Sequence, residues 1–129
     1  MVRGRVLIID DDRGTRDGLR FAFIRRDWEV VVTETEAEGL ALLTDYAPDW
    51  VIVCWDQLGG TGARFLRELR ARKRGTRVSL LTGPGAHAPG RFGPGSGPDL
   101  TFHKPVQADD VYGACAALTA GDPAVGRAV

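Results

Sequence analysis

PDWVIVCWDQLGGTG, residues 48 to 62, joins an apolar run to a glycine-rich turn. The run from Trp50 to Cys54 is rich in β-branched residues and shows no alternation of polar and apolar side chains. Such a run is typical of a strand that is covered on both faces, as in a parallel sheet. The stretch therefore predicts a buried strand. Either Cys54, which ends the strand, or Asp56, two residues later, holds the position where chemistry is expected.

Three other short apolar runs have the same character and predict further strands. They are RVLII (5–9), WEVVVT (28–33) and VSLLT (78–82). Between the runs, apolar residues recur at helical spacing. The residues that mark these helices are Leu19, Ala22 and Phe23, then Ala37, Leu40, Ala41 and Leu43, then Phe65, Leu66 and Leu69. Thr35 and Glu38 predict a capping box before the second helix. A further helix is predicted at about 107–119, before Gly121.

The alternation of strands and helices predicts an α/β fold with a parallel sheet and right-handed crossovers. In such a sheet the functional site lies at the carboxyl ends of the strands. Polar residues follow the predicted strands at that edge, at Asp10 to Asp12, Cys54 to Asp56, Thr82 and Lys104. We therefore expect these side chains to converge.

Composition bounds the class of protein. A chain of 129 residues fits one domain, which we expect at residues 1–121 with a tail at 122–129. The 17 Lys and Arg residues balance the 17 Asp and Glu residues, so no overall field attracts nucleic acid or a membrane surface. The apolar runs are too short for a membrane span or a signal peptide, so a cytoplasmic location is expected. The two cysteines lack metal-ligand spacing and are expected to be free thiols.

Residues 83–98, GPGAHAPGRFGPGSGP, break the pattern. Ten of these sixteen residues are Gly or Pro. Glycine raises the entropic cost of ordering a helix, and proline removes a backbone donor and clashes with the preceding turn. The segment is therefore predicted to be a loop rather than a helix.

Taken together, these motifs resemble the receiver domain of bacterial two-component response regulators, from about residue 4 to 120. The matching segments, in the order that the family has them, are VLIIDDD (6–12), PDWVIVCWDQLGGTG (48–62), VSLLTG (78–83) and HKP (103–105). The resemblance implies a flavodoxin-like, doubly wound sheet of five parallel strands in the order 2-1-3-4-5, with five helices. Because residues 83–98 span the place of the fourth helix, we expect that helix to be missing or replaced by a loop.

The resemblance also implies roles for the residues at the strand ends. In such receivers an acidic pair after the first strand binds Mg²⁺, an aspartate that ends the third strand accepts a phosphoryl group, and a hydroxyl and a lysine respond to it. By motif, the acidic pair falls on Asp10 and Asp11, the hydroxyl on Thr82 and the lysine on Lys104. The acceptor's place falls on Cys54.

A thiol at the acceptor's place implies an atypical, degenerate receiver. It lowers the attraction of the pocket for a hard dication, which prefers oxygen ligands. No cofactor is required, although Asp10, Asp11 and Asp56 keep Mg²⁺ binding open. We expect no enzyme, but a protein-interaction module of bacterial signal transduction that works without phosphorylation. The expected partner is a signalling protein, with an output domain or a homodimer left open, and neither nucleic acid nor a membrane is expected.

Other interpretations stay open at this stage. The domain could be a thiol-based sensor that uses Cys54, or a receiver still phosphorylated at Cys54 or Asp56. Asp10 and Asp11 could merely cap the first helix. His103 and Lys104, adjacent in a strand, should point to opposite sides, so a Cys54–His103 pair is not expected.

Arginines recur at helical spacing after residue 62. They are Arg64, Arg67, Arg70 and Arg74. The spacing predicts a basic stripe, which is either a solvated helix face or a surface for an acidic partner or nucleic acid.

Overall fold

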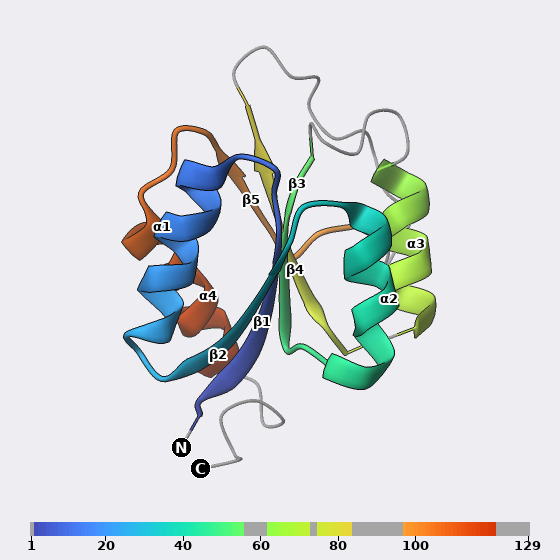
Figure 1. Cartoon of the computed structure of the whole chain (residues 1–129), viewed down its shortest axis with the longest axis horizontal. Helices are drawn as coiled ribbons and strands as arrows, with labels where there is room; N and C mark the ends of the chain where they lie inside the picture. Colours follow the sequence, from blue (N-terminus) through green and yellow to red (C-terminus); the bar gives the residue numbers. More distant parts are fainter. Residues whose placement is uncertain (1, 56–61, 73–74, 84–96, 121–129) are drawn as a thin grey trace.

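Five parallel strands form one sheet in the order β2-β1-β3-β4-β5 in this computed structural model (Figure 1). The structure describes residues 2–55, 62–72, 75–83 and 97–120. The strands are β1 (Gly4–Ile9), β2 (Trp28–Thr33), β3 (Trp50–Cys54), β4 (Arg77–Thr82) and β5 (Leu100–His103). The helices of the described residues are α1 (Arg13–Ile24), α2 (Glu36–Tyr46), α3 (Gly62–Arg72) and α4 (Ala108–Ala120). The predicted α/β fold and the strand order are confirmed.

The sheet separates two apolar cores, because each strand sends alternate side chains to opposite faces. Helices α1 and α4 cover one face, and α2 and α3 cover the other (Figure 1). In β1, Leu7 and Ile9 belong to the core under α2 and α3, whereas Val6 and Ile8 belong to the core under α1 and α4. Strand β3 lies between β1 and β4, and all of its residues are buried. Its unbroken apolar run therefore reflects a core on each side.

Side-chain oxygens cap the first two helices. Asp12 Oδ2 accepts a hydrogen bond from Thr15 N at 2.9 Å at the start of α1. At the start of α2, Thr35 Oγ1 accepts a hydrogen bond from Glu38 N at 3.2 Å and donates one to Glu38 Oε1 at 2.8 Å. The predicted cap is confirmed, although the glutamate carboxylate bonds the threonine hydroxyl.

The helical spacing predicted the buried face of α1 better than that of α2. The buried residues of α1 are Leu19, Ala22 and Phe23, as predicted. In α2, Leu43 is buried, but Ala37 and Ala41 are exposed and Gly39 is buried instead. A Cβ atom at position 39 would lie 2.3 Å from Cδ1 of Ile9, so the helix contacts β1 through a residue without a side chain. Hydropathy spacing does not register such a contact.

A carboxylate just before β5 holds this edge strand against β4. Asp99 Oδ2 accepts a hydrogen bond from Val78 N at 2.7 Å, and Asp99 N donates one to Val78 O at 2.8 Å. The guanidinium groups of Arg70 and Arg77 lie 3.2 and 3.4 Å from the two oxygens of the carboxylate. Asp99 therefore joins α3, β4 and β5.

Arg70 does not belong to a solvated stripe along α3, so that part of the prediction is wrong. Its side chain is only 17% exposed. Besides Asp99, it donates hydrogen bonds to the carbonyl groups of Thr76 and Gly97. Arg67 is exposed, as a solvated face requires, and Arg74 lies outside the described residues.

Two further predictions fall largely outside the described residues. They are the loop in place of a helix at 83–98, of which residues 84–96 are not described, and the tail at 122–129. Both stay predictions. Within the described part of the chain, no helix is long and apolar enough to cross a membrane.

Replacing Asp99 should loosen the edge of the sheet. We expect Asp99→Ala to lower the free energy of unfolding by about 3 kcal/mol, because it removes the carboxylate that pairs with Arg70 and leaves the Val78 amide without its acceptor. Asp99→Asn should lower the free energy of unfolding by less, since its amide oxygen can still accept the hydrogen bond from Val78 N. Urea unfolding followed by circular dichroism measures both. Equal loss in the two variants would mean that the charge of Asp99 alone matters.

The buried thiol of Cys115 should make stability depend on pH. Burial raises the pKa of Cys115 from 9.0 to about 12, and the weak hydrogen bond to Ser79 only partly opposes this. The unfolded chain therefore loses this proton first, and the free energy of unfolding falls as pH rises from about 9 toward 12. Urea midpoints measured at about pH 8 and about pH 10 should differ less in Cys115→Ala than in the parent chain. Ser79→Ala, which keeps the thiol, should retain most of the difference.

Candidate functional site

Asp10 is a buried carboxylate at the carboxyl end of β1. None of its surface is exposed (0%). Its Oδ1 accepts a hydrogen bond from Asp12 N at 2.9 Å, and its Oδ2 lies 2.9 Å from Nζ of Lys104. Within the described residues Oδ2 makes no hydrogen bond of good geometry, so Lys104 compensates for its burial mainly as an ion-pair partner. The pair is the centre of the site.

Lys104 follows β5 and joins three strand ends. Its Nζ lies 2.9 Å from Oδ2 of Asp10 and 3.6 Å from Sγ of Cys54, and its backbone N donates a hydrogen bond to Thr82 O at 2.6 Å. Its side chain is 18% exposed. Burial alone would lower the pKa of Lys104, but the adjacent carboxylate of Asp10, together with Cys54, outweighs burial, and the pKa of Lys104 is raised. Lys104 is therefore charged at neutral pH and acts as the ion-pair partner of Asp10.

Cys54 is the last residue of β3 and lies beside Leu81 of β4 in the sheet. It is buried, and like Cys115 it is a free thiol, as predicted. Of the residues predicted to converge, the structure thus brings together Asp10, Cys54 and Lys104. Their meeting follows from the parallel sheet, whose carboxyl ends lie at one edge.

Thr82, at the end of β4, is engaged by a residue to which the sequence assigned no role. Its Oγ1 lies 2.8 Å from Nδ1 of His103 and 3.4 Å from the carbonyl oxygen of Phe102, to which it donates a hydrogen bond. His103 therefore contacts the threonine, whereas Lys104 contacts Cys54. The two neighbours have different partners, in agreement with the predicted alternation.

Arg16 is a second residue that the sequence did not indicate. Its Nη1 donates a hydrogen bond to the carbonyl oxygen of Asp10 at 3.3 Å and lies 3.4 Å from Oε1 of Glu34. It supports the chain where β1 passes into α1. Nothing in the sequence distinguishes Arg16 from Arg13 or Arg20 on the same helix.

The three consecutive aspartates have different environments. Asp12 caps α1, so the interpretation that Asp10 and Asp11 serve as the cap is wrong for Asp10, which is buried against Lys104. Asp11 is exposed and has an interaction of its own. Asp56 lies outside the described residues. Among the residues that are described, no group of three or more His, Cys, Asp or Glu side chains is arranged to hold a metal ion.

The fold and this edge of the sheet agree with a known family. A family model described as the response regulator receiver domain matches residues 6–116. The chain belongs to this family. The receiver is 29% identical over 109 residues to the photosynthetic apparatus regulatory protein RegA of Rhodobacter capsulatus. This match covers 84% of this chain and 59% of RegA. It is 30% identical over 109 residues to the acid tolerance regulatory protein ActR of Rhizobium meliloti (strain 1021), covering 84% of this chain and 56% of ActR. The receiver thus spans less than two-thirds of the length of these curated relatives.

Solved structures share the fold of this receiver. A response regulator from Thermotoga maritima has a TM-score of 0.77 at 19% identity, covering 94% of this chain and 100% of that chain. A CheY-like receiver domain protein from Methanospirillum hungatei JF-1 has a TM-score of 0.75 at 20% identity, covering 92% and 94% of the two chains. At such identities the likeness concerns the fold alone.

Removing the cation of the receiver's buried pair should destabilise it. We expect Lys104→Ala to lower the free energy of unfolding by about 2 to 3 kcal/mol, because Asp10 is then buried without a compensating charge. The measurement is urea unfolding near neutral pH in the presence of a chelator, so that no added cation replaces the ammonium. Adding Asp10→Asn to Lys104→Ala should recover part of the loss. If the single variant unfolds at the parent midpoint, the ion pair contributes nothing to stability.

Proposed function

We propose that this receiver is a protein-interaction module of two-component signalling that works without aspartyl phosphorylation. The observation that carries the proposal is the contact of Lys104 Nζ with Cys54 Sγ, at 3.6 Å, beside the ion pair with Asp10. In receivers the lysine after the fifth strand responds to the phosphoryl group on an aspartate that ends the third strand. Here the residue that ends β3 and contacts the lysine is a cysteine.

The chemistry of a thiol supports the proposal. An acyl phosphate forms on a carboxylate, and Cys54 has none. An ordinary thiol has a pKa of about 8.5 and is mostly protonated at neutral pH. The pocket also carries one negative charge fewer than it would with an aspartate at this position.

The acidic residues that remain fit a metal ion poorly without help from Asp56. Both oxygens of Asp10 already have partners, one in Asp12 N and the other in Lys104, and Asp11 is exposed. Mg²⁺ prefers several oxygen ligands in an octahedral arrangement, and two carboxylates on this loop supply few. We therefore propose that the module requires no cofactor and is not an enzyme.

The names of the relatives suggest the setting of the module. RegA and ActR are named as regulatory proteins, and both are longer than this chain. We propose a signalling protein as the partner and the cytoplasm as the location, with an output domain or a second copy as further candidates. A nucleic-acid partner is not proposed for this domain, because its 17 basic residues are balanced by 17 acidic ones.

A thiol-based sensor is the second candidate function. The contact between Lys104 and Cys54 favours it, because a nearby ammonium stabilises a thiolate, the reactive form of cysteine. The burial of Cys54 opposes it, since oxidants must reach the sulfur. The two functions differ in what should modify the protein.

Intact mass spectrometry separates these functions. We expect acetyl phosphate with Mg²⁺ to leave the mass of the parent chain unchanged, and Cys54→Asp, which restores a carboxylate at the end of β3, to gain a phosphoryl group that hydroxylamine removes. A phosphoryl group on Cys54 or Asp56 of the parent chain would contradict the proposal. In a parallel arm with dilute peroxide, oxidation of the parent chain that is lost in Cys54→Ser would favour the sensor.

A further inference from the structure

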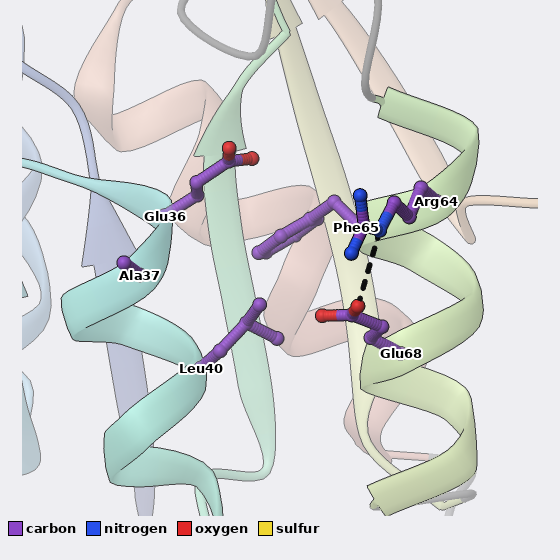
Figure 2. Close-up of a pocket in the computed structure, with 6 residues that line it drawn as sticks. All are labelled: Glu36, Ala37, Leu40, Arg64, Phe65 and Glu68. Carbon is purple, nitrogen blue, oxygen red and sulfur yellow. Dashed lines mark hydrogen bonds and ion pairs between the residues drawn. The ribbon is translucent and has the colours of Figure 1, made fainter.

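The groove between α2 and α3 is balanced in charge (Figure 2). Arg64 pairs with Glu68 across 3.4 Å, and Glu36 has an interaction of its own. Arg72 donates a hydrogen bond to the carbonyl oxygen of Leu40 at 2.8 Å, so a further guanidinium lies between the same two helices. The groove therefore shows no preference for an acidic or a basic partner.

Thr82 and His103 form a polar pair at the carboxyl edge of the sheet. They are the last residues of β4 and β5 and are partners in the parallel register of these strands. Thr82 is only 3% exposed, whereas His103 is exposed. Oγ1 of the threonine lies 2.8 Å from Nδ1 of the histidine ring. The ring therefore supplies a buried hydroxyl with a close partner from the edge strand.

The hydroxyl of Thr82 has one proton and two contacts on β5. It donates a hydrogen bond to the carbonyl oxygen of Phe102 at 3.4 Å, so its proton is used there. The contact with Nδ1 of His103 then requires that the ring nitrogen carry a proton and donate it to Oγ1. The two bonds exist together only when Nδ1 is protonated. The position of the ring proton therefore reports whether the pair is formed.

The hydroxyl and Lys104 have different partners, although both follow from the ends of β4 and β5. In the part of the chain that the structure describes, the contacts of Thr82 Oγ1 are with Phe102 and His103. The ammonium of Lys104 contacts Asp10 and Cys54 instead. In receivers the hydroxyl and the lysine respond together to the phosphoryl group. Here the hydroxyl is engaged on β5 and the lysine on β1 and β3.

We propose that His103 is a latch that holds the Thr82 hydroxyl on β5 and keeps it out of the pocket around Cys54. Because Thr82 is buried, water does not readily replace the ring, and a hydroxyl that turned away would lose its close partner. The bond to Phe102 is longer than a normal O–H···O bond and holds the side chain weakly. His103 is thus a positioning residue that acts through Thr82.

The latch rests on the proposed function and deepens it. A thiol at position 54 removes the phosphoryl acceptor, and the latch removes the response of the hydroxyl. Restoring a carboxylate at position 54 is therefore not enough to restore switching. Phosphorylation of the parent chain would overturn the proposed function, but it would not alter the ring proton of His103 measured without a phosphodonor. The two ideas fail separately.

NMR of the ¹⁵N-labelled parent chain tests the latch at about pH 8, above the usual titration range of histidine. Long-range proton–nitrogen correlations give the tautomer of His103, and three-bond couplings give the χ1 rotamer of Thr82. We expect a proton on Nδ1 and a single rotamer. Thr82→Val should move the proton to Nε2, whereas Thr82→Ser should keep it on Nδ1. His103→Val should populate further rotamers of Thr82, whereas His103→Asn, whose amide can donate in place of Nδ1, should retain one.

Thr101→Val is the matched control, because Thr101 is exposed on the same strand two residues before His103. It should leave the tautomer and the rotamer unchanged. An equal effect of this variant means a general loosening of β5 and overturns the latch. A proton on Nε2 in the parent chain, or an unchanged Thr82 rotamer in His103→Val, also overturns it.

Cys54→Asp tests the consequence of the latch for switching. In the chain phosphorylated by acetyl phosphate with Mg²⁺, Thr82 should keep the parent rotamer in Cys54→Asp and settle in a new one when His103→Val is added. A new rotamer in both variants means that the hydroxyl responds despite the ring, and a new rotamer in neither means that the ring is not what holds it. Either result overturns the latch, and a change in the double variant alone supports it.

Discussion

The carboxylate buried at the end of β1 is the constraint on which the site depends. An ionised group without exposed surface is costly unless an opposite charge compensates for it. Lys104 supplies that charge for Asp10, but it follows β5, and β3 and β4 lie between β5 and β1 in the sheet. The lysine has to pass the ends of two strands, and Cys54 lies at the end of one of them. The contact with the thiol is therefore a consequence of the ion pair and the strand order.

The same constraint makes the position of β5 important. Strand β5 is short and lies at the edge of the sheet, and its residues are only partly buried. Contacts at both ends of β5 compensate for this limited burial. Asp99 joins it to β4 and α3 before its first residue, and the backbone of Lys104 donates a hydrogen bond to Thr82 after its last. Stability at the edge of the sheet and the position of the ammonium are therefore coupled.

The proposed function of this receiver starts from the same pocket. The pocket holds a paired cation beside a thiol, so we propose a binding function that does not wait for a phosphoryl group.

The sequence by itself determined what depends on neighbouring residues. The bounds of β2 and β3, the buried residues of α1, the cap of α2 and the position of Cys54 at a strand end all followed from local periodicity and capping. The strand order was predicted from the resemblance to receiver domains, because local periodicity does not indicate which strands are neighbours in the sheet. The buried position of Gly39 was not predicted, because a residue without a side chain adds nothing to a hydrophobic pattern. Its missing side chain nevertheless permits the close approach of α2 to Ile9.

Only the tertiary structure decided which polar groups meet. Thr82 with His103, Arg70 with Asp99, and Lys104 with Asp10 among the three consecutive aspartates join residues from separate elements. The residue types alone do not distinguish these pairs from the many other charged residues of the chain. Sheet order, register and side-chain direction select them, because a buried charge is stable only where the fold brings its partner within reach. Arg70 illustrates the point. Its spacing along the helix predicted a solvated side chain, but in the structure the side chain pairs with Asp99 and is largely buried.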